Sequence, residues 1–332
     1  MPANQHPRRA LPARFRRQRL LIVGCGDVGQ RVARLLAPQG GGRPPAPRPL
    51  VMALTSSPAK RAQLRALGIV PLAGNLDDAA SLRRLAGLAP RVLHLAPPGT
   101  VADADLRTRA LLQALARARR APCVVYGSTS GVYGDCQGAL VAETRMPRAQ
   151  TARARRRVDA ERQLRRYALG HRRRGARSHI LRIPGIYAGD REGGTPEARL
   201  LRGTPVLRPQ DDVFTSHIHA DDLARAAASA LWRGRPQRIT NVCDGTRMRM
   251  GEYFDLAADL WGLARPPRIS RAEAQQALPP LLLSFMSESR RLANRRMLRE
   301  LRIAPRYPTV EPGLQAAILL QKEKAPAGRR SV

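Results

Sequence analysis

The feature that most constrains the fold is an apolar run of strand length that leads directly into a glycine turn and then into a helix. Residues 20–23 read LLIV, the next six residues read GCGDVG, and residues 30–36 have the composition of a helix. A buried strand followed at once by such a turn and helix is typical of the first βα unit of a parallel sheet. The start of the helix offers free N–H groups and the positive end of the helix dipole to an anion. The pattern therefore predicts a phosphate-binding turn.

The three glycines have separate predicted roles. Gly24 permits the tight turn, Gly26 lets the backbone approach a diphosphate, and Gly29 allows the helix to pack closely on the strand. Asp27 and Val28 lie between them and are expected to border the same ligand. A glycine-rich turn that holds no ligand is the alternative. The strand, turn and helix in sequence favour a dinucleotide such as NAD(P).

The end of the second predicted strand favours NADP over NAD. An NAD-selective fold usually carries Asp or Glu there, to accept a hydrogen bond from the ribose 2′-OH. Residues 54–61 instead read LTSSPAKR, and Thr55, Ser56 and Lys60 suit a 2′-phosphate, with Arg31 placed to help. The alternative is an ordinary hydroxyl turn that caps the next helix, beside a solvated Lys60. Both can hold at once.

Beyond the turn, apolar runs alternate with Ala/Leu/Arg segments of helical period, which predicts an α/β fold of the Rossmann type, a doubly wound parallel sheet with a smaller mixed C-terminal lobe. The predicted strands are 20–23, 50–54, 70–72, 92–95, 123–126 and 179–183, and the helices lie near 27–37, 58–67, 78–87, 103–119 and 150–170. The predicted organisation is a disordered basic tail (1–18), an NAD(P)-binding domain (19–184), a substrate lobe (185–322) and a tail (323–332), with a Pro/Gly-rich surface loop at 40–48.

Composition limits the class of partner. The net charge of +34 suggests a polyanion partner in isolation, but all except three of the 59 basic residues are arginine, spread along the chain. Aromatic residues make up only 4%, and no helix-turn-helix, RRM or KH signature is present, so specific nucleic-acid binding is not expected. Weak nonspecific binding at low salt is expected.

Targeting signals and cysteine usage point to a cytoplasmic protein. No apolar run is long enough to span a membrane, and the arginine-rich start is either a disordered extension or an organellar transit peptide. The four cysteines form no CxxC pair, which predicts reduced thiols and no zinc site. His217 and His219 beside Asp221 and Asp222 form the one pattern that suggests a metal, because alternating positions of an extended segment face one way.

Several further segments resemble one family. These are GNLDD (74–78), VYGSTSGVYGD (125–135), ILRIPGIY (180–187), FTSHIHADDL (214–223) and NVCDG (241–245). Together they are similar to the NAD-dependent epimerase/dehydratase branch of the extended short-chain dehydrogenase/reductases, over most of residues 19–315. Residues 287–301 (SESRRLANRRMLREL) resemble a divergent bacterial subgroup of that family.

The resemblance implies site residues. Thr129 occupies the position of the hydroxyl that hydrogen-bonds the substrate oxygen. Asn75 and Leu76 border the adenine, with Asn75 in place of the usual Asp, and Ala96 and Pro184 lie along the cofactor. A homodimer is common in the family, and a small-molecule substrate is implied.

The resemblance also bears on the metal interpretation of His217 and His219. It makes Asp221 and Asp222 the cap of the helix near Leu223, so a metal site is not expected.

The catalytic YxxxK pair of the family is missing. Alignment on Glu161 puts Arg153 at the tyrosine position and Arg157 at the lysine position. A guanidinium stays protonated, so Arg153 cannot exchange a proton as a phenol does, but it can clamp a carboxylate or phosphate. Arg157 can still donate to the nicotinamide ribose. A solvated basic helix face is the alternative interpretation of both arginines.

If proton transfer occurs, Tyr133, Asp135 or Glu143 must supply it, and Tyr133 is preferred. The sequence thus predicts an NADP-dependent oxidoreductase or epimerase/dehydratase-like enzyme with a small anionic or sugar-nucleotide-like substrate. The alternatives are a catalytically silent NAD(P)-binding redox sensor or partner-binding protein, and a polyanion-binding protein on the same fold.

Overall fold

The computed structural model describes residues 18–37, 49–101 and 103–324. Most of the two predicted tails and the whole of the 40–48 loop lie outside these ranges. Gln18 is described, and its side chain accepts hydrogen bonds from Arg91 and Trp232. No helix in the described ranges has the length and hydropathy needed to cross a bilayer.

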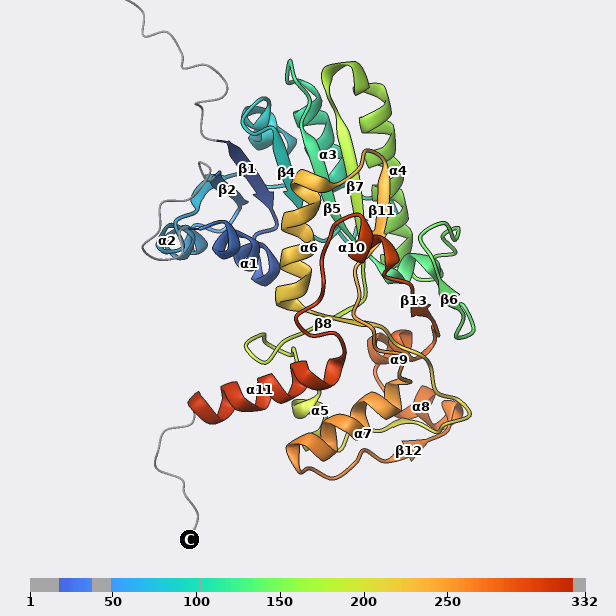
Figure 1. Cartoon of the computed structure of the whole chain (residues 1–332). Helices are drawn as coiled ribbons and strands as arrows, with labels where there is room; N and C mark the ends of the chain where they lie inside the picture. The colour runs from blue at the N-terminus through green and yellow to red at the C-terminus, as the bar shows by residue number, and fades with distance from the viewer. Residues whose placement is uncertain (1–17, 38–48, 102, 325–332) are drawn as a thin grey trace, which may run out of the picture.

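A parallel sheet of seven strands forms the centre of the molecule, in the order β11-β7-β5-β4-β1-β2-β3 (Figure 1). β1 pairs with β2 on one side and with β4 on the other, so the strand order reverses at β1. In such a sheet the ligand binds outside the carboxyl ends of the strands, at this switch point. The strands are β1 (Arg19–Val23), β2 (Leu50–Thr55), β3 (Val70–Ala73), β4 (Arg91–His94), β5 (Cys123–Thr129), β7 (Arg177–Ile183) and β11 (Arg238–Asn241).

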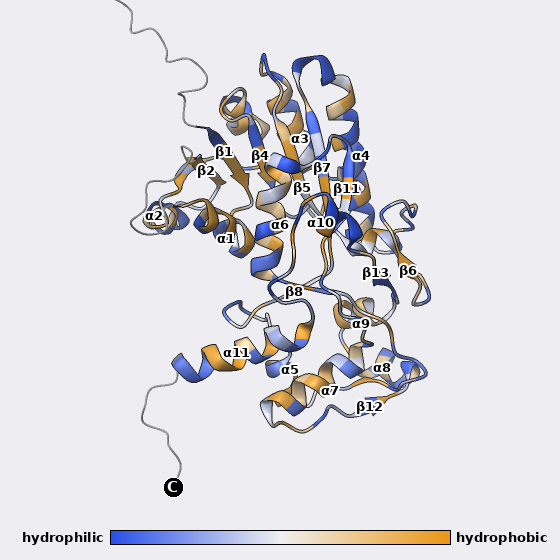
Figure 2. Cartoon of the chain, viewed as in Figure 1, coloured by the Kyte–Doolittle hydropathy of each residue, from blue (hydrophilic) through white to orange (hydrophobic). Residues whose placement is uncertain are grey.

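Helices cover both faces of the sheet, because successive side chains of each buried strand point to opposite faces. Leu20 and Ile22 of β1 pack in the core with α1 (Asp27–Leu36) and α6 (Ala220–Arg233), whereas Leu21 and Val23 pack in the core with α3 (Leu106–Ala116) and α4 (Ala152–Gly170). Figure 2 shows the apolar residues gathered in the strands. The covering helices are α1 (Asp27–Leu36), α2 (Ala59–Ala66) and α6 (Ala220–Arg233) on the first face, and η2 (Ala79–Leu85), α3 (Leu106–Ala116) and α4 (Ala152–Gly170) on the second.

The structure confirms the predicted α/β Rossmann-type fold and corrects its boundary. The strands and helices predicted before residue 184 are all present, although the segment near 78–87 is a 3₁₀ helix. β11 and α6 follow residue 185 in the chain but belong to the sheet and its core. The predicted boundary at 184/185 therefore does not separate the sheet from the smaller lobe.

The smaller lobe lies below the sheet in Figure 1 and has its own core. Its main helix, α7 (Met250–Trp261), packs against α5 (Glu197–Leu201) and α11 (Val310–Lys324). Three short pairs of parallel strands, β8–β10, β9–β12 and β6–β13, lie outside the central sheet. Each pair joins two segments that are far apart in the sequence. The remaining elements are η3 (Ser130–Tyr133), β6 (Leu140–Val141), η4 (Arg172–Arg174), β8 (Gly185–Tyr187), α5 (Glu197–Leu201), β9 (Val206–Leu207), β10 (His217–His219), β12 (Arg268–Ile269), α8 (Arg271–Ala277), α9 (Pro280–Met286), β13 (Arg291–Leu292), α10 (Arg295–Arg299) and α11 (Val310–Lys324).

Candidate cofactor and substrate site

The glycine turn between β1 and α1 has the shape that a diphosphate requires. Gly24 has φ +85°, and a Cβ at this position would lie 2.3 Å from the backbone nitrogen of Ala96. A Cβ at Gly29 would lie 3.2 Å from Ile22 Cγ2, so the missing side chain lets α1 approach β1. A Cβ at Gly26 would meet no atom within 4 Å, which leaves open space where the backbone is exposed.

The start of α1 is open to an anion. Gly26 is its N-cap, no side chain caps the helix, and the backbone N–H of Gln30 is already bonded to the carbonyl of Gly26. The N–H groups of Asp27, Val28 and Gly29 belong to the first turn, where the helix itself provides no acceptor. An uncapped helix start beside an open glycine fits the diphosphate of a dinucleotide.

A charged cluster ties the loop after β8 to α1. Arg31 is only 5% exposed and donates to Asp27 (2.9 Å), Asp190 (2.5 Å) and Asp221 (2.5 Å). Arg191 donates to Asp27 at 2.6 Å. The expectation that Arg31 helps to bind a 2′-phosphate is wrong, because three carboxylates already occupy its guanidinium.

The end of β2 carries hydroxyls and a cation but no carboxylate. Thr55 Oγ1 accepts a hydrogen bond from the N–H of Ser57, so the hydroxyl turn is present, while Ser56 and Lys60 are exposed. Burial raises the pKa of Cys25 in the glycine turn to about 11, and the charge of Lys60 acts against this rise.

The predicted adenine and cofactor residues lie along the same edge of the sheet. Asn75 follows β3 and is exposed, with its Oδ1 accepting from the N–H of Asp77, and Leu76 packs at the edge of the core. Ala96 follows β4, donates its N–H to the carbonyl of Val23, and lies against Gly24. Pro184 follows β7 and lines the pocket described next.

A cavity of about 590 Å³ opens at the carboxyl ends of β5 and β7, between the sheet and the smaller lobe. Thr129, Arg153, Arg157 and Pro184 all line it, so the structure brings together four of the residues predicted from the sequence. The other walls come from β8, β10, α5, α7 and the segment 284–290.

Thr129 and Arg157 are held in place by β5. Thr129 ends the strand, and its Oγ1 accepts from the N–H of Gly131. Arg157 Nη1 donates to the hydroxyl of Tyr126 at 2.9 Å and to the carbonyl of Gly127 at 2.7 Å. Arg157 is thus fixed beside the strand rather than spread over a solvated helix face.

The proton donors suggested by the sequence lie outside the cavity. Tyr133 is fully buried, its hydroxyl donates to Asn241 at 2.7 Å, and burial raises its pKa. Asp135 accepts from the N–H of Ser289, and Glu143 from the N–H of Asn241. None of the three lines the cavity, so the preference for Tyr133 is not supported.

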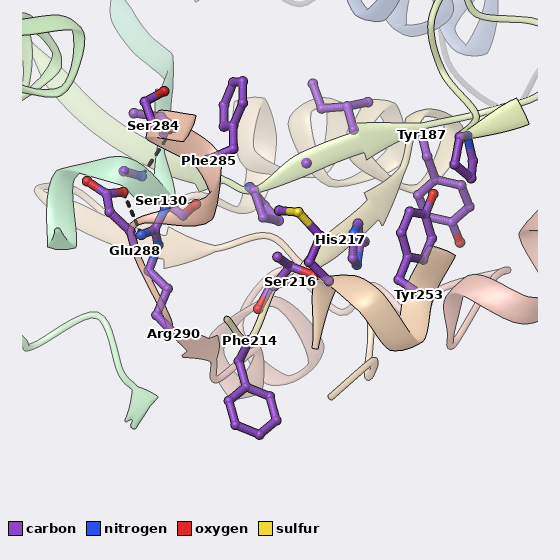
Figure 3. A pocket seen from close by; sticks show the side chains of 18 of the residues that line it. Ser130, Tyr187, Phe214, Ser216, His217, Tyr253, Ser284, Phe285, Glu288 and Arg290 are labelled. Atoms are coloured by element: carbon purple, nitrogen blue, oxygen red, sulfur yellow. Dashed lines mark hydrogen bonds and ion pairs between the residues drawn. The ribbon is translucent and has the colours of Figure 1, made fainter. Parts of the chain in front are cut away.

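Glu288 is the carboxylate that the cavity does contain. It is 8% exposed, and its Oε2 accepts from Arg290 Nη1 at 2.7 Å. Its Oε1 is enclosed without a hydrogen-bond partner. Figure 3 shows Glu288 and Arg290 beside Ser130. The segment 287–301 resembles a subgroup of the family, and its only sequence signal for this contact is an acid two residues before a pair of arginines.

Aromatic rings form another wall of the cavity. His217 stacks on Tyr253 with ring centroids 4.4 Å apart and meets Tyr187 edge-on (Figure 3). Burial lowers the pKa of His217 to about 4, so this imidazole is neutral at pH 7. In the described part of the chain no group of three or more His, Cys, Asp or Glu side chains could hold a metal.

The cap predicted for the helix near Leu223 is also corrected. α6 starts at Ala220, and His219 is its N-cap, since His219 Nδ1 accepts from the N–H of Asp221. Asp221 pairs with Arg31, and Asp222 accepts from the backbone of the segment before α11. Both acids lie in the first turn of the helix, where they favour its dipole.

Comparisons with known proteins agree with this geometry at the level of the fold. No family model matches the sequence, and no curated protein does so either. Among solved structures, a conserved protein of unknown function from Silicibacter pomeroyi is 29% identical, with a TM-score of 0.73, over 92% of this chain and 99% of that one.

Two enzymes are similar as well. A dTDP-glucose 4,6-dehydratase from Streptomyces venezuelae, solved with NAD bound, is 23% identical over 92% of this chain and 98% of that one, with a TM-score of 0.71. A UDP-glucose 4-epimerase from Thermotoga maritima, solved with UDP-glucose, is 18% identical over 92% and 99%, with a TM-score of 0.70. The chain therefore has the same Rossmann-type α/β fold as these two enzymes.

Proposed function

We propose that this protein is an NAD(P)-dependent oxidoreductase or epimerase/dehydratase-like enzyme that prefers NADP and acts on a small anionic substrate. The observation that carries the proposal is the open start of α1 beside Gly26, at the same sheet edge as a cavity lined by Thr129 and Arg157. A dinucleotide held at the first place would extend toward the second.

The preference for NADP rests on charge at the end of β2. Thr55 ends the strand, Ser56 and Lys60 are exposed, and no carboxylate stands where one would accept from a ribose 2′-OH. A cation and a hydroxyl suit a 2′-phosphate, which would be repelled by an acid.

The residues of the cavity divide the remaining tasks. A bound nicotinamide would supply or accept a hydride. Thr129 would hydrogen-bond the substrate oxygen, Arg157 would donate to the nicotinamide ribose, and Arg153 would hold an anionic group of the substrate.

Glu288 would accept and return the proton in the reaction. It is the one acidic residue among the described residues that line the cavity, and its Oε1 is enclosed without a partner. A carboxylate within reach of a substrate hydroxyl can accept and return a proton, which the guanidinium of Arg153 cannot do.

We expect the wild-type protein to change the nicotinamide absorbance with at least one compound in a panel of anionic aldehydes, ketones and alcohols. Glu288→Gln should lower kcat with that compound about 100-fold, since general acid–base catalysis contributes about that much. Calorimetry should show NADPH affinity within about twofold of wild type, because the substitution lies away from the glycine turn.

The matched control is Glu192→Gln, the same change at an exposed residue outside the cavity lining, which should leave kcat unaltered. Full turnover in Glu288→Gln would refute the role of Glu288. NADPH binding without turnover on any panel member would favour the redox sensor or partner-binding protein, which the replacement of YxxxK by Arg153 and Arg157 also allows.

A further inference from the structure

Five arginines line the substrate cavity, and they differ in their partners. Three of them are engaged by acceptors within the chain: Arg157 by Tyr126 and Gly127, Arg191 by Asp27, and Arg290 by Glu288 and Gly134. The other two, Arg153 and Arg199, form no hydrogen bond or ion pair through their side chains with any described residue.

Arg199 lies on α5, in the smaller lobe, and is partly buried. Its guanidinium stacks over the ring of Phe254 at 4.2 Å, and its Nε and Nη2 are enclosed without a hydrogen-bond partner. Burial lowers its pKa to about 10, and the neighbouring charge of Arg202 acts in the same direction. Burying a charged guanidinium without a hydrogen-bond partner lowers the free energy of unfolding. An anion bound beside it would offset that loss.

Arg153 lies on α4, beside the sheet, and repeats this arrangement. Its guanidinium lies 4.8 Å from the ring centroid of Phe285 and is more exposed than that of Arg199. Partial burial lowers its pKa, while the charge of Glu288 acts in the opposite direction. Glu288 does not balance the charges of Arg153 and Arg199, because its carboxylate is already paired with Arg290 through Oε2.

Each guanidinium lies over an aromatic ring, and a guanidinium binds carboxylate or phosphate oxygens through its planar set of N–H groups. The two arginines come from different parts of the molecule, the sheet side and the smaller lobe, yet both border one cavity. A substrate with one anionic group would leave the second guanidinium uncompensated.

We infer that the substrate is a small dianion, with one carboxylate or phosphate group at Arg153 and a second at Arg199. This inference shares one premise with the proposed function, namely that this cavity binds the substrate. Arg199 then sets specificity, because it selects substrates that carry an acidic group at the end remote from Thr129.

The test is calorimetric titration of the full chain with simple probes. These are acetate, inorganic phosphate, the dicarboxylates from malonate to adipate, and 3-phosphonopropionate, which separates carboxylate from phosphate recognition. We expect at least one two-headed probe to bind about tenfold or more tighter than acetate and phosphate, since each charge-assisted pair adds about that factor.

Arg199→Met and Arg153→Met should each remove about tenfold of that affinity, because methionine keeps the contact with the aromatic ring and loses the charge. Arg173→Met, at an exposed arginine of η4 outside the cavity lining, is the matched control and should leave the affinity unaltered. Arg199→Lys, which keeps the charge without the planar edge, should fall between wild type and Arg199→Met.

The inference is overturned if no probe binds saturably, if the two-headed probes bind no better than acetate and phosphate, or if the best probe binds Arg199→Met and Arg199→Lys as tightly as wild type. NADPH titration of the same samples keeps the two proposals apart. Dianion binding without NADPH binding would refute the proposed function alone, and NADPH binding without dianion binding would refute this inference alone.

Discussion

Gly26→Val is expected to abolish NADPH binding while leaving the fold intact. A Cβ at Gly26 meets no protein atom within 4 Å, and φ −84° is accessible to valine, so the protein has room for the side chain. The same room is where the diphosphate must approach the backbone. We expect NADPH affinity measured by calorimetry to fall about 100-fold or more, because the phosphates lose the helix start as well as the space.

Two other glycines sharpen this prediction. Gly170→Val also adds a side chain in open space, at the end of α4, and should bind NADPH as wild type does. Gly24→Ala should instead impair folding, because its Cβ would collide with the backbone at Ala96. NADPH affinity unchanged in Gly26→Val would place the cofactor elsewhere.

Among the single substitutions considered, Arg182→Met is expected to lower the free energy of unfolding the most. Arg182 is 1% exposed and donates to Glu161 through Nε at 3.0 Å and Nη2 at 2.7 Å, and Glu161 also accepts from Ser128. Burial alone would lower the pKa of Arg182, but the bonds to Glu161 raise it. Removing one partner of a buried pair leaves the other charge uncompensated, at a cost of about 3–5 kcal/mol.

Urea denaturation gives this cost directly. Arg182→Met with Glu161→Met should recover much of the lost stability, since no isolated charge remains in the core. Arg265→Met, which breaks an exposed ion pair with Asp259, should leave the midpoint nearly unaltered. A small effect of Arg182→Met would contradict the view that this pair holds β5, α4 and β7 together beneath Thr129 and Arg157.

The fold could be predicted because its signals are local. The run from Leu20 to Gly29 contains a buried strand, a turn and a helix start within ten residues, and the later strands repeat the alternation of apolar runs with helical segments. β11 was not placed in the sheet because its neighbour β7 lies more than fifty residues earlier, and no local pattern encodes that pairing.

The sequence predicts some residues of the candidate site and not others. Thr129, Arg157 and the glycines follow from motifs, whereas Glu288 and Arg199 reach the cavity through tertiary packing of the smaller lobe. Tyr133 and Arg31 were misjudged for the same reason, since the sequence does not reveal that Asn241 and three carboxylates already occupy them. The homodimer, the cytoplasmic location and the absence of a specific nucleic-acid partner stay predictions.

Titration of the wild-type protein with NADPH and then NADH tests the central claim most directly. We predict saturable binding of both at one site per chain, with NADPH about tenfold tighter because its 2′-phosphate gains the charge of Lys60. Lys60→Ala should remove most of that difference. If neither nucleotide binds, the turn at Gly24–Gly29 is not a dinucleotide site, and the proposed nicotinamide-dependent function is contradicted.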